Sequence, residues 1–387
     1  MSFAAGGEWW WVVVALAGVS VTVLAAAGRL RRRRWRCWIS AAFGGAGCIA
    51  AVSWAAVLAT SVPTSAAAAP ASAAAPASWG VAQVVAPKVT PTATAWPVGG
   101  PDSGLMMPAL GPDGSVWIGE MAANKIARLR PAGNVVQQVT LPGGYKEIMG
   151  LAVGQDGRVW IAEEHAQALG MFDPSTGLYH QYQIPGADPA PLGIAVDASG
   201  NVWFTEMNGD RIGRFDPGTA RFTQFSIPTR GAAPYWLAIA PDGGVWFTDF
   251  GTGRVGVLQP ATGQIRQYRL PADQYPVGIA VSPGGTPWVA TIEGSLFRVQ
   301  PVTGSMRRFL VPTADTYGVA VTGDGTVWLG MASGDAVYAF DPVSARFLRY
   351  VLPSAQAPWW LVAAGSHQVW VAVSANAGEL GEISAAG

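Results

Sequence analysis

The sequence predicts an all-β fold, a seven-bladed β-propeller with four-stranded blades, preceded by N-terminal transmembrane helices. Two long uncharged stretches come first in the chain. A short phrase such as GNVWFTE then recurs, and repeats of about 40 residues with four strands each are typical of propeller blades. The central residue of the phrase is a tryptophan, spaced by 40 to 43 residues, at Trp117, Trp160, Trp203, Trp246, Trp288, Trp328 and Trp370.

Residues 1–62 form the predicted membrane region. Residues 9–27 and 37–62 carry no charged side chain, and each is long enough to cross a bilayer, which takes about 20 apolar residues. The six arginines of residues 29–36 are expected to stay on the cytoplasmic side, which places the propeller outside the cytoplasm on an anchored chain. The alternative is a long signal sequence, cleaved near residues 65–68, and a secreted product.

Residues 63–91 are rich in Ala, Pro and Ser and carry one charged residue, Lys88. Such a composition offers little apolar surface to bury, so we expect a semi-extended linker. The propeller is expected to occupy residues 92–387.

Each repeat of the propeller is expected to form four strands. The first is small and apolar, as in GIAV, and suits the crowded centre of a radial array. The second carries the tryptophan, which we expect to pack between blades; the third resembles RIGRF, and the fourth alternates polar and apolar residues. Glycine supplies the positive φ of the turn between the first two strands at Asp113-Gly114, Asp156-Gly157, Ser199-Gly200, Asp242-Gly243 and Asp324-Gly325.

The last repeat ends after GELGEIS and lacks a fourth strand. Residues 92–98, which precede the first repeat, resemble the fourth strands of the other repeats. Pairing this segment with the last blade would close the ring and remove its exposed edges.

Composition limits the function. Hydrophobic residues make up 50% of the chain and charged residues 12%, which excludes a disordered protein. After residue 88 the chain has 17 basic and 23 acidic residues, a net charge of −6, so we expect no nucleic-acid partner. The two cysteines, Cys37 and Cys48, precede the propeller, which therefore has no disulfide or cysteine metal site. We expect a monomer with a small-molecule or peptide ligand at the channel mouth.

The channel mouth is the predicted site, because the innermost strand of a propeller blade begins, and the second ends, on the same face. The sequence predicts a pocket that is acidic on one flank and aromatic on the other, suited to a ring-bearing ligand with a cation or metal nearby. Alternatively, the acids pair with backbone N–H groups and the aromatic side chains fill the funnel. The candidate ligand-binding residues are Glu120, Glu206, Asp249, Tyr235, Trp236, Tyr317, Trp359 and Trp360.

The candidate catalytic residues are Glu164 and His165, which follow Glu163 directly. Of the three histidines, His165 alone is expected in a loop on the channel face, where it could act as a general base or a ligand. The alternative is that it has no functional role.

The phrases P-x-G-I-A-V, G-N-V-W-F-T-E and N-x-I-G-R resemble the virginiamycin B lyase (streptogramin lyase) family of seven-bladed propellers over about residues 92–387. The resemblance implies a carbon–oxygen lyase that opens a cyclic depsipeptide at its ester. In such a reaction a histidine takes the proton α to the carbonyl, while carboxylate-bound Mg²⁺ steadies the enolate.

The family pattern Glu-x-His-Gly followed by Trp-Phe-x-Glu matches Glu147–Gly150 and Trp160–Glu163, with Met149 in place of the histidine. The resemblance therefore implies Mg²⁺ on Glu147 and Glu163, with His165 as the substitute base. The second hypothesis is a non-catalytic propeller that binds a peptide, a glycan or a protein partner.

Overall fold

The computed structural model describes residues 92–100, 103–352, 357–373 and 378–384, together with three short strands nearer the N-terminus. The chain divides into two compact units, residues 1–67 and 68–387.

The N-terminal unit is described at two strands, β1 (Val13–Leu16) and β2 (Val19–Thr22), which pair antiparallel. These two strands fall within the first predicted transmembrane span, residues 9–27, and the structure does not show the predicted helix there. The rest of that span and the whole of the span at 37–62 lie outside the described residues. No helix in the described part of the chain is both long enough and apolar enough to cross a membrane.

The predicted linker is described at one point. β3 (Val84–Val85) pairs parallel with the outer strand of the sixth blade, with Val84 opposite Phe347 and Val85 opposite Leu348. This part of the linker therefore adds a fifth strand to that blade and is not a free tether. The other residues of 63–91 lie outside the described part of the chain.

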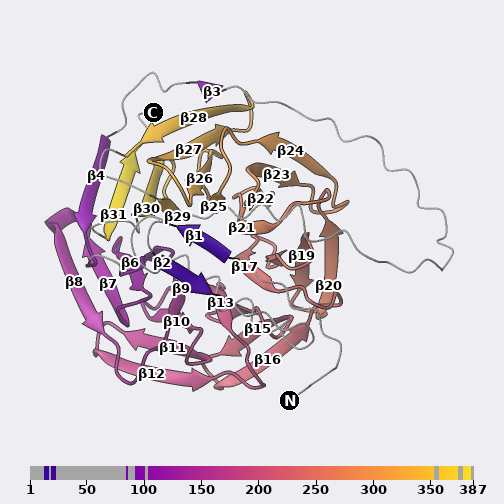
Figure 1. The fold of residues 1–387 in the computed structure, drawn as a ribbon. Helices are drawn as coiled ribbons and strands as arrows, with labels where there is room; N and C mark the ends of the chain where they lie inside the picture. Colours follow the sequence, from indigo (N-terminus) through magenta and orange to yellow (C-terminus); the bar gives the residue numbers. More distant parts are fainter. Residues whose placement is uncertain are drawn as a thin grey trace, which may run out of the picture. The chain divides into compact units, whose positions relative to one another are not determined.

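Residues 92–384 form the predicted seven-bladed propeller, with consecutive antiparallel strands running outward from a central channel (Figure 1). The innermost strands of neighbouring blades contact one another around the ring, from β5 through β29 and back to β5. In the first three blades the strands are β5 (Ala109–Leu110), β6 (Val116–Glu120), β7 (Lys125–Arg130) and β8 (Val135–Thr140); β9 (Ile148–Val153), β10 (Val159–Glu163), β11 (Ala168–Asp173) and β12 (Leu178–Gln183); and β13 (Pro191–Val196), β14 (Val202–Glu206), β15 (Arg211–Asp216) and β16 (Arg221–Ser226).

The other four blades repeat this order, and a 3₁₀ turn (Pro131–Gly133) precedes β8 in the first blade. Their strands are β17 (Pro234–Ile239), β18 (Val245–Asp249), β19 (Arg254–Gln259) and β20 (Gln264–Arg269); β21 (Pro276–Val281), β22 (Pro287–Thr291), β23 (Ser295–Val299) and β24 (Met306–Leu310); β25 (Thr316–Val321), β26 (Val327–Met331), β27 (Ala336–Asp341) and β28 (Arg346–Val351); and β29 (Pro358–Ala364), β30 (Gln368–Val373), β31 (Glu379–Ser384) and β4 (Thr92–Pro97).

The ring closes as predicted. β4, which precedes the first blade in the chain, pairs antiparallel with β31 of the last blade along its whole length, and the two strands lie side by side in Figure 1. Trp96 on β4 packs against Trp370 on β30, with ring centroids 5.2 Å apart. The two ends of the propeller therefore share one blade, which leaves no gap in the ring.

The repeated tryptophans pack the blades together, as predicted. All seven are at most 3% exposed. Their neighbours belong to the hydrophobic clusters that fill the spaces between successive blades. Three of them meet a phenylalanine on the third strand of the next blade, with centroids 5.6 to 6.0 Å apart: Trp117 and Phe172, Trp160 and Phe215, and Trp288 and Phe340.

The small residues of the innermost strands allow neighbouring blades to meet at the channel. A Cβ added to Gly193 would lie 2.9 Å from the Cα of Trp236, and one added to Gly318 would lie 2.6 Å from the carbonyl oxygen of Trp359. Both distances are shorter than a van der Waals contact. The glycines therefore set how closely the strands around the channel can approach.

Candidate functional site

The strand register confirms that two sets of residues share one face of the propeller. The first residue of an innermost strand lies opposite the last residue of the second strand, as in Pro191 with Glu206 and Pro234 with Asp249. The loops at this end of the channel form the face that we call the channel mouth. The predicted site residues come from these strand ends and loops.

The four carboxylates at the ends of the second strands lie inside their blades and not along the channel mouth as predicted. Each is at most 1% exposed and accepts a hydrogen bond from the side chain of a glutamine 18 residues later, on the outer strand of the same blade. The side chains thus extend away from the channel. The pairs and distances are Glu120 and Gln138 (2.8 Å), Glu163 and Gln181 (2.6 Å), Glu206 and Gln224 (2.8 Å), and Asp249 and Gln267 (2.6 Å).

Burial dominates the electrostatics of these four carboxylates. Loss of water around the charged form raises the pKa of Glu120, Glu163 and Glu206, although the glutamine hydrogen bonds oppose the change. For Asp249, burial raises the pKa to about 6 despite hydrogen bonds from Thr252 and Gln267. The sequence identified these four carboxylates, but it did not show which way their side chains point. That direction depends on glutamines from another strand.

Glu163 belongs to a buried polar cluster in the second blade. Its carboxylate accepts hydrogen bonds from the Tyr179 hydroxyl and the Gln181 side chain, and the Lys146 ammonium lies 3.8 Å away. The same ammonium lies 5.1 Å from the centre of the Tyr179 ring. Gly170 leaves the space that the Glu163 carboxylate crosses, because an added Cβ would collide with it. Burial and the adjacent Glu163 raise the pKa of Tyr179.

This cluster does not fit the predicted Mg²⁺ site. A cation, Lys146, already lies beside Glu163, and both carboxylate oxygens accept protein hydrogen bonds. In the part of the chain that the structure describes, no group of three or more His, Cys, Asp or Glu side chains is placed to hold a metal ion. Mg²⁺ on Glu147 and Glu163 stays a prediction from the family resemblance.

The candidate catalytic residues lie in the turn after β10. The Glu164 amide donates to the Glu147 carbonyl, and the His165 amide donates to the Lys146 carbonyl, each at 3.0 Å. The His165 side chain is exposed and lies against Tyr145, with ring centroids 5.5 Å apart, whereas Glu164 is 7% exposed. Glu163 is fully buried within the blade, so the structure does not gather it with the exposed His165 ring.

Met149 occupies the position of the histidine in the family pattern. It is 1% exposed and packs in the core at the start of β9. A thioether cannot accept a proton at neutral pH, so this position supplies no general base.

The aromatic residues do gather at the channel, as the sequence predicted. Trp236 of the fourth blade stacks on Trp360 of the seventh, with centroids 4.5 Å apart, and both are at most 2% exposed. Tyr317 lies 5.2 Å from Trp359 and 6.4 Å from Trp360, and Tyr235 lies 6.5 Å from Trp360. The two stacked tryptophans stand where other blades have glycine, such as Gly193 and Gly318, and they pack across the channel.

Two aromatic residues that the sequence reading missed extend this group. Phe250 lies 5.7 Å from Tyr235, and Tyr275 lies 5.7 Å from Phe250 and is 41% exposed. Phe250 follows the end of β18 and Tyr275 precedes β21, so a search one residue beyond the strand ends would have found them. We call the six residues that follow one another by ring contact the aromatic belt: Tyr275, Phe250, Tyr235, Trp360, Tyr317 and Trp359.

Carboxylates lie near the belt, although they are not the ones that the sequence indicated, apart from Glu164. Burial raises the pKa of Tyr235, and the nearby Tyr317 and Glu164 raise it further. Burial, followed by Asp315 and Glu293, raises the pKa of Tyr317 to about 12. The belt is therefore a partly buried ring surface with carboxylates nearby.

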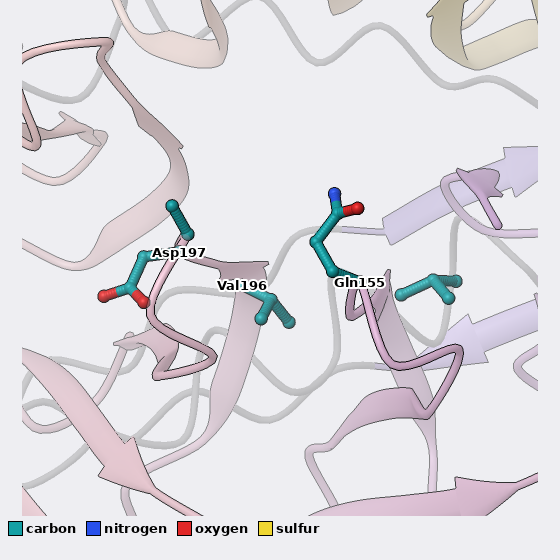
Figure 2. Close-up of a pocket in the computed structure, with 5 residues that line it drawn as sticks. Gln155, Val196 and Asp197 are labelled. Atoms are coloured by element: carbon teal, nitrogen blue, oxygen red, sulfur yellow. The ribbon is translucent and has the colours of Figure 1, made fainter. Parts of the chain in front are cut away.

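A separate cavity of about 290 Å³ opens at the other end of the blades, between the first turns of blades two and three. Figure 2 shows Gln155 on one side of it and Val196 and Asp197 on the other. The Asp197 carboxylate already accepts hydrogen bonds from Trp203 and Asn201 at 2.8 and 2.9 Å. The cavity thus lies at the opposite end of the blades from the channel mouth, and the stacked Trp236 and Trp360 pack across the channel.

Comparison with known proteins finds one matching family and several solved structures with a similar fold. The sequence model of the Virginiamycin B lyase family matches residues 91–383. The structure of selenomethionine-substituted virginiamycin B lyase from Staphylococcus aureus has a TM-score of 0.71 and 24% identity, over 76% of this chain and 100% of the lyase. A catalytically inactive histidine-to-alanine variant of the S. aureus lyase, with quinupristin, has a TM-score of 0.70 at the same identity and the same coverage.

Hydrazine synthase from Kuenenia stuttgartiensis has a TM-score of 0.63 at 15% identity, over 73% of this chain and 96% of that one. At these identities the solved structures show a shared fold. No curated protein matches the sequence.

Proposed function

Because the chain belongs to the virginiamycin B lyase family, we propose that it uses the family's propeller to bind a ring-bearing ligand at the channel mouth, without catalysing elimination. The observation that carries the proposal is the aromatic belt. Tyr235, Tyr317 and Trp359 are half-buried. Tyr235 and Tyr317 rest against Trp360, whose stack with Trp236 gives them a rigid base, and Trp359 packs on Tyr317. Preorganised ring faces bind a flat ligand at little entropic cost.

The residues that would carry elimination support binding over catalysis. The position of the family histidine holds Met149, which is buried, and Glu163 is engaged by Tyr179 and Gln181 inside the blade. His165 is exposed and packs on Tyr145. A general base must reach the proton that it abstracts, and no described side chain combines with these carboxylates to do so.

A binding experiment with two neutral probes tests the proposal. Tryptophol carries a hydroxyethyl group on a flat indole ring, and 2-cyclohexylethanol carries the same group on a saturated ring that is not flat. We expect tryptophol to bind measurably tighter in calorimetry and Trp359→Ala to weaken it by about tenfold, since ring stacking contributes about 1 kcal/mol or more. Val343→Ala, in a 96% exposed turn on the opposite face, is the control. Equal binding of the two probes would contradict the proposal.

Lyase activity is the alternative that the family suggests, and the same protein can be tested for it. Quinupristin, which is present with the inactive S. aureus variant, would be incubated with the wild type and with Glu163→Gln. We expect no linear product in chromatography. A linear product that forms with the wild type and not with Glu163→Gln would favour the lyase.

We also propose that the propeller is held at the membrane, outside the cytoplasm. The support is the pair of uncharged stretches, residues 9–27 and 37–62, which flank the six arginines. The full chain should stay in the membrane fraction after an alkaline carbonate wash, and protease added outside should reach the propeller. Recovery of a shortened chain from the medium would favour the secreted alternative.

A further inference from the structure

We propose that one corner of the propeller rests on the anionic surface of the membrane that anchors the chain. The corner lies on the face opposite the channel mouth, at the outer turns of blades five and six, and we define it by Arg298, Val302, Arg307 and Val343. The inference rests on the proposed membrane attachment and adds to it the part of the propeller that meets the lipid. It combines two exposed valines, a pair of arginines and the point at which the linker joins the ring.

The two valines stand where the other blades have small or polar residues. Val302 and Val343 are 79% and 96% exposed, the highest values among the large apolar side chains of the described residues. Their turns belong to adjoining blades, since Phe309 on β24 packs against Phe340 on β27 with ring centroids 4.6 Å apart. Transfer of such side chains from water to an apolar phase is favourable. Each valine follows the proline of the turn between the third and fourth strands, and the same position in blades one to four holds Ala132, Ser175, Gly218 and Ala261.

Two arginines of blade five face one another across the strands that flank the Val302 turn. Arg298 on β23 lies directly opposite Arg307 on β24, and both side chains are exposed. Like charges in directly opposite positions destabilise a sheet. The equivalent pairs of the other blades that have this turn contain at most one arginine: Arg128 with Gln137, Met171 with His180, Arg214 with Thr223, Val257 with Arg266, and Ala339 with Leu348.

The two guanidinium groups are available to an anion from outside. Among the described residues, neither arginine forms an ion pair with a carboxylate. The Arg298 guanidinium lies 6.0 Å from the centre of the Trp288 ring, and that of Arg307 lies 4.8 Å from the centre of the Phe309 ring. A phosphate between the two groups would relieve their repulsion, and the planar guanidinium fork matches phosphate oxygens.

The carboxylates on this side of blade six have partners of their own. Asp341, in the turn of Val343, lies directly opposite Arg346 in the strand register. Asp324, in the first turn of the blade, shares a hydrogen bond with His367 at 2.9 Å. These acids therefore do not cancel the charge of the blade-five arginines.

The linker joins the ring at the same blade. Val84 on β3 lies opposite Phe347 on β28, four residues after Val343, and Val85 lies opposite Leu348. The chain that comes from the predicted spans therefore reaches the propeller beside the corner. Such an attachment raises the effective concentration of the corner at the bilayer, and it leaves the channel mouth, on the other face, open to a ligand.

Fluorescence quenching on the full chain in vesicles tests the proposal. In a background with Cys37→Ser and Cys48→Ser, one environment-sensitive label is attached to Val302→Cys or to the matched control Ser175→Cys, which lies at the same turn position in blade two. The vesicles contain phosphatidylcholine alone or with phosphatidylglycerol, and the acyl chains are ordinary or brominated. Apolar groups at an interface enter the lipid by about 5 to 10 Å, so brominated anionic vesicles should lower the Val302→Cys signal by about twofold or more and leave Ser175→Cys unchanged.

Two double variants test the arginines. Arg298→Gln with Arg307→Gln should reduce the quenching at position 302 in anionic vesicles to its value in neutral vesicles, because the attraction to anionic lipid is lost. Urea unfolding at no lower concentration than for the wild type confirms that this variant keeps the ring intact. Arg221→Gln with Arg266→Gln removes two exposed arginines from blades three and four and should keep the quenching.

The outcomes separate this inference from the membrane attachment. Equal quenching at positions 302 and 175, in a chain that migrates with the vesicles in a density gradient, would overturn the contact and leave the attachment standing. Quenching at position 302 that persists after loss of Arg298 and Arg307 would overturn the assignment to anionic lipid. A chain that does not migrate with the vesicles would show that the attachment fails, and the inference fails with it.

Discussion

The buried carboxylate of Asp249 should make the stability of the propeller depend on pH between about 4 and 6. Asp249 is fully buried, and burial raises its pKa from the usual 3.8 to about 6. In that range the folded protein holds a proton that the unfolded chain has released. Stability from this group is therefore present at low pH and is lost as the pH rises towards 6 and beyond.

The structure also sets the size of this effect. The rise of the pKa from 3.8 to about 6, at about 1.36 kcal/mol for each tenfold change in proton affinity, corresponds to at most about 3 kcal/mol. Asp249→Asn cannot ionise, and it keeps an oxygen that can accept the hydrogen bonds of Thr252 at 2.7 and 3.1 Å. The Gln267 amide, which donates to the other carboxylate oxygen at 2.6 Å, has to turn over so that its oxygen accepts from the new amide N–H. The difference in unfolding free energy between the variant and the wild type should therefore grow, in favour of the variant, by about 2 to 3 kcal/mol from pH 4 to pH 7.

Urea unfolding of the two proteins at pH 4, 5, 6 and 7, followed by tryptophan fluorescence, measures this difference. Comparing the proteins at each pH removes the contributions of the other buried carboxylates, which both share. Asp242→Asn, in an exposed turn of the same blade, controls for the loss of one charge. If the difference between Asp249→Asn and the wild type stays constant across the range, the reasoning from burial is refuted.

Three further predictions concern the ring. Gly318→Ala places a Cβ 2.6 Å from the Trp359 carbonyl oxygen and should lower the stability by about 1 to 3 kcal/mol in the same urea assay, whereas Gly284→Ala, whose nearest neighbour is 3.9 Å away, should not. Trp236→Ala removes the partner of the channel stack and should cost about 3 to 5 kcal/mol, so a loss below 1 kcal/mol would contradict the packing. Deleting residues 92–97 removes β4 and leaves β31 without its neighbour, so this variant should unfold at a lower urea concentration than the wild type. Unfolding at the same urea concentration would show that β4 does not close the ring.

The sequence predicted the propeller well because its signals are local and repeated. Seven copies of one phrase specify seven blades, and each copy contains its own turn glycine and its own packing tryptophan. The closure by residues 92–97 could also be predicted, because the last repeat lacks its fourth strand and this segment, which precedes the first repeat, resembles one. The hairpin at Val13–Thr22 and the strand at Val84–Val85 could not, because apolar composition alone does not separate a helix from a strand there.

The candidate site was predicted less completely. The aromatic residues gather as expected, because their positions follow from the strand ends that all blades share. The sequence predicted the carboxylates at the correct strand ends, but it placed their side chains along the channel mouth, whereas they point into the blades. Glu163 turns into its blade because Gly170 on the third strand leaves room and Gln181 on the fourth offers a hydrogen bond.

For this protein, then, the order of residues along the chain was enough to determine the number of blades, because each blade is built from strands that are neighbours in the sequence. It also indicated the closing strand, because the last repeat lacks a strand that the segment before the first repeat resembles. Only the closed ring decided which side chains meet across the channel. Trp236 and Trp360 are more than a hundred residues apart, and they stack at 4.5 Å because blades four and seven face the same axis. Such contacts depend on the curvature of the whole ring, which no single repeat encodes.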